Sequence, residues 1–175
     1  MELDPAVRQF VLHWGEMGSR WGINRTMAQI HALLYSSPEP IAAEEIAQVL
    51  GVARSNVSTC LRELQNWGII RITHVLGDRR DYFECRMDVW DMFRIVLAQR
   101  KKREIDPTLE TLRECVAMAA QGDTDPLTEK RLREMLEFFE TVTDWYEQIQ
   151  SMPTGAVMKF VKYAPKVKRL LGVGA

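Results

Sequence analysis

The stretch that decides the fold is residues 44–68, which read EEIAQVLGVARSNVSTCLRELQNWG. Apolar residues recur at helical spacing on both sides of Gly51, and only about four residues separate the two patterns. A break this short, with a glycine that lets the chain turn, predicts two helices that cross steeply. This is the spacing of a helix-turn-helix.

The outward face of the second helix carries short hydrogen-bonding side chains and long cations. Such groups reach base edges and phosphates when the end of a helix enters a major groove. The same residue types also suit the solvated surface of a helix in a protein-assembly unit. On the first interpretation, the DNA-contacting residues of this helix are Arg54, Ser55, Asn56, Ser58, Thr59 and Arg62.

A β-hairpin is expected directly after this helix. Gly68 is placed to end the helix, residues 69–75 are β-branched, and residues 81–86 can return as the partner strand. A hairpin here is a wing, and Arg79 and Arg80 in its turn suit a narrow, negative minor groove. Asp78 is expected to hold an arginine in position. An ordinary surface hairpin, with arginines for solubility, is the alternative.

The helix-turn-helix followed by a GDRR turn resembles the MarR superfamily of winged-helix regulators. The stretches DVWDMF (88–93) and RKKREIDPT (100–108) resemble its GbsR-type branch, named for a glycine betaine/choline-responsive repressor. The resemblance covers residues 7–150. Ala42 and Ala53 depart from it, because Ser or Thr often caps the helices there. It implies a mainly α fold with a small β-hairpin wing, a winged helix-turn-helix with flanking N- and C-terminal dimerisation helices.

Three regions are expected: an N-terminal dimerisation helix (1–22), a winged helix-turn-helix that binds double-stranded DNA (23–87), and a C-terminal helical dimerisation and effector region (88–175). Asp-Pro pairs at residues 4–5, 106–107 and 125–126 each predict the capped start of a helix. The first helix carries an apolar stripe that needs a partner, formed by Val7, Phe10, Val11, Trp14, Met17 and Trp21.

The segment after residue 125 has an a/d heptad pattern formed by Leu132, Met135, Phe139, Val142, Tyr146 and Ile149. Within one subunit this seam would be core, and across two subunits it would be an interface. We expect a homodimer, because an operator-reading helix-turn-helix normally works as a two-fold pair. Phe10 and Trp14 are assigned to the same interface.

The family resemblance implies a small effector such as choline or glycine betaine, held by cation–π attraction in an aromatic cage. Aromatic residues at helical spacing equally suit a core. The candidate cage residues are Trp14, Trp21, Trp90, Trp145 and Tyr146.

Charge is distributed unevenly along the chain, although the net charge is only -1. Residues 52–86 hold six arginines and four acids, whereas residues 104–150 hold four bases and twelve acids. The local positive charge of residues 52–86, and not the net charge of the chain, governs DNA binding. The basic cluster at residues 100–103 could touch phosphates or form the solvated end of a helix. The basic tail at residues 155–171 could dock on the acidic region, contact phosphate or touch a membrane surface.

Other functional classes lack support in the sequence. No apolar run reaches the ~20 residues of a membrane span, and residues 1–20 do not read as a signal peptide. Three cysteines, an odd number at wide spacing, favour a reducing cytoplasm. The three histidines have no ligand spacing, so no metal, cofactor or enzymatic activity is expected, and Cys60 is interpreted as a small core residue.

The sequence therefore predicts a DNA-binding transcriptional regulator, a repressor acting as a homodimer on a pseudo-palindromic operator. The alternative is a winged-helix scaffold for protein–protein interaction, with residues 126–150 as its docking surface.

Overall fold

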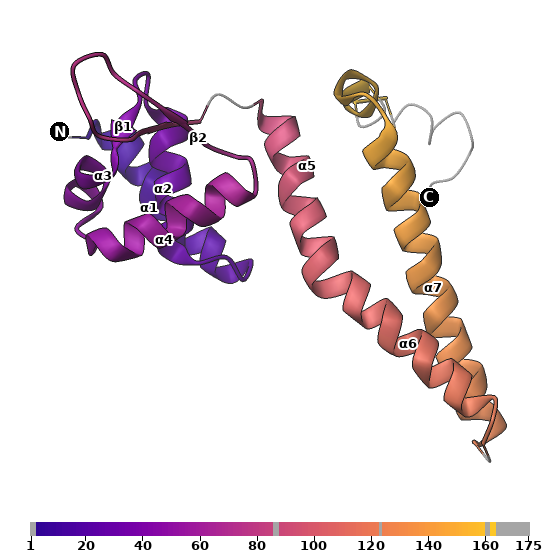
Figure 1. Ribbon diagram of the computed structural model, residues 1–175. Coiled ribbons are helices and arrows are strands. Elements are labelled where there is room, and N and C mark those ends of the chain that lie inside the picture. Colours follow the sequence, from indigo (N-terminus) through magenta and orange to yellow (C-terminus); the bar gives the residue numbers. More distant parts are fainter. Residues whose placement is uncertain (1–2, 86–87, 123, 160–161, 164–175) are drawn as a thin grey trace. The chain divides into compact units, whose positions relative to one another are not determined.

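The computed structural model describes residues 3–85, 88–122, 124–159 and 162–163 (Figure 1). The chain divides into an N-terminal unit, Met1–Ile95, and a C-terminal unit, Val96–Ala175, with the boundary inside helix α5. None of the described helices is both long and apolar enough to cross a membrane. The further division into functional regions at residues 22 and 87 stays a prediction.

Helix α1 (Pro5–Arg20) begins at the predicted residues, and helix α2 (Arg25–Ser36) follows it. Asp4 accepts a hydrogen bond from the Ala6 N–H, and Asn24 accepts one from the Met27 N–H. The face of α1 that packs on α2 differs from the predicted stripe, of which only Val11 is buried.

Two glycines let α1 and α2 approach closely. A Cβ atom on Gly18 would lie 2.5 Å from the Cβ of Ala28, and one on Gly15 would lie 2.6 Å from the Cγ of Gln29. Because α1 packs on α2 through these glycines, Phe10 and Trp14 of the predicted stripe are only half-buried.

The helix-turn-helix consists of α3 (Ala43–Leu50) and α4 (Arg54–Asn66). Gly51 turns the chain with a φ of 64°, and neither Ala42 nor Ala53 makes a side-chain cap. Gly68 ends α4 with a φ of 74°. The Gly68 N–H donates to the Gln65 carbonyl, and the Ile69 N–H donates to the Leu64 carbonyl. This pair of hydrogen bonds defines a Schellman motif.

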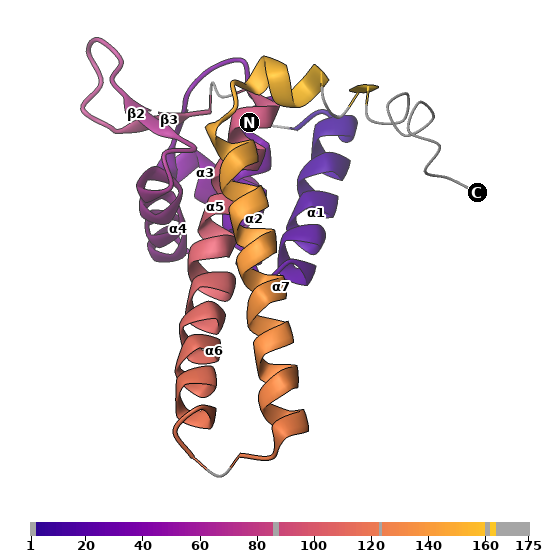
Figure 2. The same cartoon turned by 90° about the vertical axis from the view of Figure 1, so that its right-hand side faces the viewer.

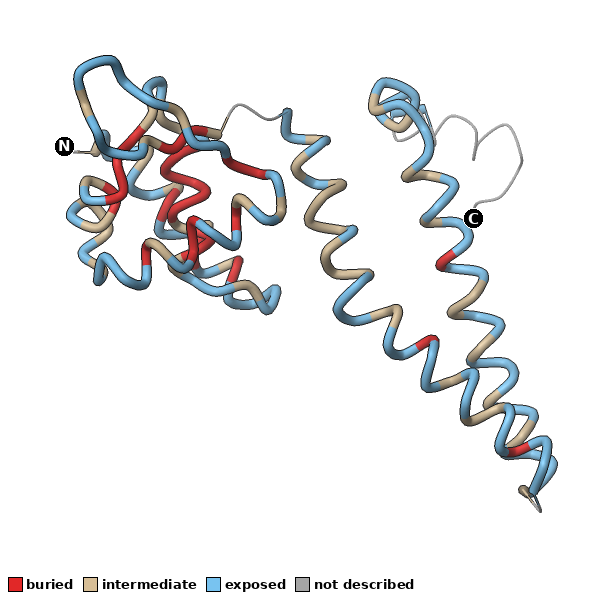
Figure 3. The backbone as a smooth tube through the Cα atoms, in the orientation of Figure 1, coloured by how far each residue is buried: buried red, intermediate tan, exposed pale blue. Residues whose placement is uncertain are grey.

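The core of the N-terminal unit lies where α2 meets the two helices of this motif, which Figure 3 shows as the main concentration of buried residues. The largest buried side chains of α2 are Met27, Ile30, Leu33 and Leu34, and those of α3 and α4 are Ile46, Val57, Leu61 and Leu64.

A three-stranded antiparallel sheet forms the base of the wing, in the order β1-β3-β2. Strands β2 (Arg71–Thr73) and β3 (Tyr82–Glu84) are the predicted hairpin, although both are shorter than predicted. Strand β1 (Ile41–Ala42) was not predicted. Ile41 pairs with Phe83, a partner forty-two residues away that no local pattern reveals.

Helix α5 (Val89–Arg100) begins after Asp88, whose carboxylate accepts from the Trp90 N–H. The predicted helix start at residues 106–107 matches the first residues of α6 (Asp106–Ala119), but the predicted side-chain cap is absent. The chain stays helical through a π-turn, η1 (Lys101–Ile105), into α6, and Asp106 has helical φ and ψ of −59° and −45°. Pro107 lies in the first turn of α6, directly after the π-turn, a position at which a helix tolerates proline.

Helix α7 (Pro126–Ser151) starts at the predicted cap, Asp125, and lies alongside α6 as a helical hairpin (Figures 1 and 2). Only Leu109, Ala119 and Thr143 are buried among the described residues of the C-terminal unit (Figure 3). After Pro153 the backbone is helical again at residues 154–159, and most of the predicted basic tail lies outside the described residues. The predicted class, mainly α with a small β wing, is confirmed.

Candidate DNA-binding site

The exposed face of α4 presents three of the predicted contact residues to solvent: Ser55, Thr59 and Arg62. The Thr59 hydroxyl donates to the Ser55 carbonyl at 3.1 Å and keeps its lone pairs for other donors. Arg62 makes no hydrogen bond or ion pair with any residue that the structure describes. The Arg62 guanidinium is therefore available to contact DNA when this face enters a groove.

Asn56 is exposed, and it also makes a hydrogen bond within the protein that the sequence did not predict. Its amide nitrogen donates to Thr26 Oγ1 at 3.2 Å, which ties the first turn of α4 to the first turn of α2. The Cys60 thiol lies 3.5 Å from Asn56 Oδ1. Burial, and then Glu63, raises the pKa of Cys60, which agrees with its interpretation as a core thiol.

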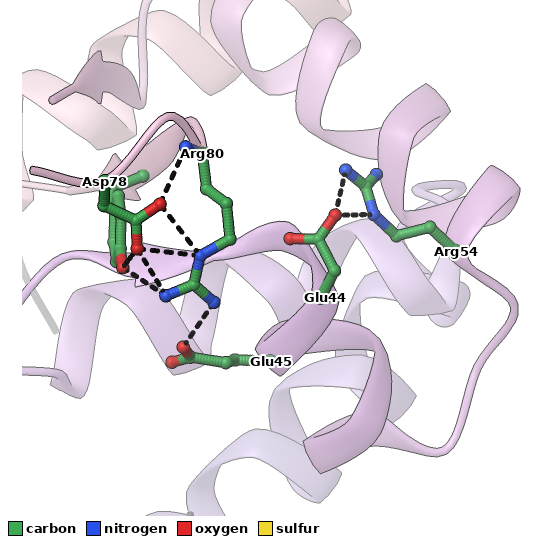
Figure 4. Close-up of polar contacts among 6 residues, drawn as sticks. Glu44, Glu45, Arg54, Asp78 and Arg80 are labelled. Carbon is green, nitrogen blue, oxygen red and sulfur yellow. Dashed lines mark hydrogen bonds and ion pairs between the residues drawn. The ribbon is translucent and has the colours of Figure 1, made fainter.

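Arg54 and Ser58 belong to a junction between the two helices of the motif. The Arg54 guanidinium donates to Glu44 Oε1 at 2.9 Å and also to Ser58 Oγ (Figure 4). A hydrogen bond at its own backbone, followed by Arg54, lowers the pKa of Glu44, so this carboxylate stays ionised. The junction orients α4 and uses one of its predicted DNA-contacting cations.

Arg80 is the most heavily bonded side chain of the wing (Figure 4). Its guanidinium donates to both oxygens of Asp78, at 2.7 to 3.2 Å, to the Tyr82 hydroxyl at 2.6 Å, and to Glu45 of α3 at 3.2 Å. The Tyr82 hydroxyl donates in turn to Asp78 at 2.8 Å. The prediction that Asp78 holds an arginine in position is confirmed.

Electrostatics reinforce this cluster, which we call the wing clamp (Glu45, Asp78, Arg80 and Tyr82). Hydrogen bonds from Arg80 hold the pKa of Asp78 well below its usual range, and Asp78 raises the pKa of Arg80. The hydrogen bond to Asp78 also raises the pKa of Tyr82. Asp78, Arg80 and Tyr82 therefore keep their charge state near neutral pH, and the clamp joins the wing turn to Glu45 in the first turn of α3.

Arg79 is the neighbouring arginine and behaves differently. It is exposed in the turn and has no hydrogen bond or ion pair within the described part of the chain. Leu76 is fully exposed in the same turn, a feature that the prediction of a polar turn did not emphasise. Arg71 pairs with Glu84 across the hairpin at 2.5 Å.

The described residues thus separate the arginines of this region into two groups. Arg54, Arg71 and Arg80 are paired with carboxylates, whereas Arg62 and Arg79 are not. Arg86 lies outside the described residues.

Sequence reasoning missed the contributions of α2 and α3 to this surface. Arg25 is exposed at the start of α2, next to the Thr26 that bonds Asn56. Glu44 and Glu45 were visible only as acids in the first turn of a helix. Their bonds to Arg54 and Arg80 span ten and thirty-five residues, and no spacing rule covers such distances.

The predicted effector residues are divided between the two units, and their role stays a prediction. Within the N-terminal unit, the rings of Trp14 and Trp21 meet edge to face with centroids 6.1 Å apart, and Trp90 makes no ring contact with a described residue. Within the C-terminal unit, Trp145 is 58% exposed and the Tyr146 hydroxyl accepts from Gln150. Trp14 also stacks near Phe10 and His31, which makes it part of an aromatic row on α1 and α2.

The predicted dimerisation seam divides into two stripes on α7. Leu132, Phe139 and Tyr146 are half-buried on the face of Thr143, the side that α6 covers. The other stripe is exposed and includes Phe138 and Trp145, which are not among the predicted seam residues. Its exposed members are Met135, Phe138, Val142 and Trp145, and Ile149 continues it.

The basic cluster at residues 100–103 is neither the end of a helix nor a set of unpaired cations. Arg100 and Arg103 pair with Glu104, and Lys101 pairs with Asp106 and Glu147. Three of its four cations are therefore neutralised by neighbouring carboxylates.

Comparisons with known proteins agree with this geometry. The MarR family model matches residues 21–81, which span α2, the helix-turn-helix and most of the wing. The HTH-type transcriptional regulator MmpR5 of Mycobacterium tuberculosis is 30% identical over 81% of this chain and 85% of its own length. The chain belongs to the MarR family.

Other similarities are weaker. The HTH-type transcriptional repressor GbsR of Bacillus subtilis is 22% identical over 83% of this chain and 85% of its own length. A solved transcriptional regulator is 27% identical and superposes with a TM-score of 0.60, covering 83% of this chain and 96% of that one. This MarR-family chain is more similar to MmpR5 than to GbsR, so its place in the GbsR-type branch stays a prediction.

Family membership gives the coarse function. The chain is a winged helix-turn-helix transcriptional regulator that binds DNA, and not an enzyme.

Proposed function

We propose that this chain is a homodimeric repressor that reads a pseudo-palindromic operator. Each α4 would enter a major groove with Ser55, Thr59 and Arg62 toward the DNA, and each wing would place Arg79 in the flanking minor groove. The observation that carries the proposal is the wing clamp, in which Arg80 is bonded to Asp78 and Glu45 while Arg79 remains unpaired. A fixed wing with one free cation suits insertion into a groove, because little further ordering is needed on binding.

The proposed dimer rests on the exposed stripe of α7. Phe138 and Trp145 are 59% and 58% exposed, and Met135 and Val142 continue the row at heptad spacing. A large, contiguous apolar row on a soluble helix favours a partner surface. The two-fold axis of a dimer would then match half-sites about 10 bp apart or slightly more.

A small effector is the remaining part of the proposal. Choline or glycine betaine is suggested by the resemblance to the GbsR-type branch, whose repressor GbsR is a relative of this chain. The five aromatic candidates give this effector little support, because Trp145 is exposed and Trp14 belongs to an aromatic row. An effector would act by binding two states of the dimer with different affinity.

Fluorescence anisotropy with DNA from upstream of the chain's own gene tests the proposal, with a scrambled duplex of equal length as the control. We expect tighter binding to the upstream DNA by about a thousandfold or more at physiological salt. Equal affinity for both duplexes would instead favour the protein–protein scaffold. Adding choline or glycine betaine to the specific complex tests the effector, and unchanged affinity would remove both compounds from the proposal.

A further inference from the structure

Leu76 has the most exposed apolar side chain of the residues that the structure describes. It is 104% exposed, and the next large apolar side chain, Met118, is 72% exposed. The segment that joins β2 to β3 extends beyond the sheet, and Leu76 lies within it (Figure 2). A single exposed leucine is ordinary on a protein surface. What distinguishes Leu76 is that its backbone is held in place while its side chain packs on nothing.

The backbone presents Leu76 on a tight turn. The Asp78 N–H donates to the Val75 carbonyl at 3.0 Å, and Gly77, the third residue of this turn, has a φ of 86°. Leu76 does not have a positive φ, so the turn is of type II, whose third position favours glycine. The Arg80 N–H donates to Asp78 Oδ1 at 2.9 Å, which fixes the residues that follow. Hydrogen bonds of the neighbouring residues therefore hold the turn, and the leucine side chain is not needed for it.

The surroundings of Leu76 match a DNA groove better than a protein partner. Arg79 lies three residues further along the same turn, and its guanidinium has no hydrogen bond or ion pair with a described residue. Apolar surface continues only to Val75 and Ile72, which are 44% and 39% exposed. A stable protein interface buries about 800 Å² on each partner, more than one turn presents. A minor groove about 6 Å wide, in contrast, admits a narrow turn with a cation.

The floor of the minor groove differs between base pairs in one group. A·T and T·A pairs present only the acceptors N3 of adenine and O2 of thymine, and G·C pairs add the N2 amino group of guanine. This amino group occupies the middle of the floor. A leucine side chain would collide with it and would remove water from a donor that leucine cannot satisfy. At an A·T pair the same space is open, so a leucine at this depth favours A·T pairs.

The two exposed side chains of the turn divide the recognition of DNA between them. We propose that Leu76 is a specificity-determining residue that lies on the minor-groove floor and selects A·T over G·C pairs, an inference that rests on the proposed placement of the wing in that groove. Arg79 supplies affinity through its charge, which any sequence attracts. Leu76 carries no charge and buries apolar surface only where the guanine amino group is absent.

Anisotropy titrations of the full chain with three alternating duplexes of equal length, A–T, I–C and G–C, test this role. Inosine pairs with cytosine as guanine does but lacks the N2 amino group, so the last two duplexes share their major-groove hydrogen-bonding groups. We expect the wild type to bind the I–C duplex about three- to fivefold tighter than the G–C duplex, and Leu76→Ser to lower this ratio below about twofold. The slope of log K against log[salt] should not change, because no charge is removed. Leu76→Met keeps an apolar side chain and should keep the ratio.

Leu127→Ser is the matched control, at a leucine that is 54% exposed on α7 in the other unit, and it should keep the wild-type ratio. Both serine variants retain Arg79, so its preference for a narrow groove does not change between them. An unchanged ratio in Leu76→Ser, an equal fall in the control, or a lower salt slope would overturn the role of Leu76. The three duplexes contain no operator, so a fall in the ratio supports this role even if upstream DNA is not preferred. An unchanged ratio beside a strong preference for upstream DNA would overturn this role alone.

Discussion

At the scale of single residues, the two wing arginines differ although they are adjacent in sequence. Arg80 is bonded to two carboxylates and a phenol, whereas the guanidinium of Arg79 has no described partner. A paired cation contributes less to phosphate neutralisation than a free one, but its removal exposes the carboxylates that it covers. The two positions should therefore respond differently to the same substitution.

We expect Arg79→Ala to weaken operator binding and to lower the slope of log K against log[salt] by about one. Arg80→Ala should weaken binding more strongly, because Asp78 and Glu45 then face phosphate without their cation and the wing loses its clamp. Anisotropy titrations at several salt concentrations measure both effects. If Arg79→Ala leaves the slope unchanged, Arg79 does not contact the backbone, and Arg62→Ala then serves as the comparison for the major groove.

His31 provides a prediction about pH. It is 6% exposed, next to Trp14 and Tyr35, and burial lowers its pKa from 6.5 to about 4. The unfolded chain therefore binds a proton at this site between pH 6.5 and 4 that the folded chain does not bind. The free energy of unfolding should fall by up to about 3 kcal/mol as the pH drops through that window. Urea titrations at several pH values measure the fall, which His31→Gln should reduce. An identical pH profile for that variant would contradict the assignment.

At the scale of elements, the close approach of α1 and α2 depends on residues without side chains. Gly18→Val should destabilise the N-terminal unit by about 1–3 kcal/mol, because a Cβ there would lie 2.5 Å from the Cβ of Ala28 and the helices would have to separate. Urea unfolding followed by circular dichroism measures the change. Gly155→Ala is the matched control, since its new Cβ meets nothing within 4 Å. Equal stability of the two variants would mean that α1 is not held at this distance.

The same elements show which parts of the fold the sequence could predict. The helix starts at Asp4 and Asp125, and the helix end at Gly68, follow from bonds within a few residues, and all three were predicted correctly. Strand β1 and the Gly18 contact were missed because their partners are distant in sequence. The helix start at residues 106–107 was predicted, but the continuous helical backbone before it was not, because nothing in the local sequence indicated the π-turn η1.

The candidate site divides in the same way. Periodicity and turn residues predicted that α4 has an outward face and that a hairpin with arginines in its turn follows it. The pairing of Arg54 with Glu44, of Arg80 with Glu45 and of Asn56 with Thr26 was not, because each bond joins different elements. The sequence therefore predicts which polar residues lie on a helix face. Only the fold shows which of them already make hydrogen bonds or ion pairs within the protein.

At the scale of the whole molecule, the two units have different needs for a partner. The N-terminal unit has a buried core of its own, whereas just three described residues of the C-terminal unit are buried. Two helices with so little buried surface contribute little stability by themselves, because the hydrophobic effect grows with the apolar area removed from water. The exposed stripe of α7 is the surface through which a second copy would supply that area.

The variant Phe138→Glu/Trp145→Glu places two charges in this stripe and should convert the protein to a monomer. Sedimentation equilibrium should then give the mass of one 20.2 kDa chain in place of two. Operator affinity should fall steeply, because one reading head keeps only half of the contacts. Met118→Glu on α6, at a position 72% exposed, is the control and should remain a dimer. A double variant that stays dimeric would place the interface elsewhere, with the half-buried Phe10 and Trp14 of α1 as the next surface to change.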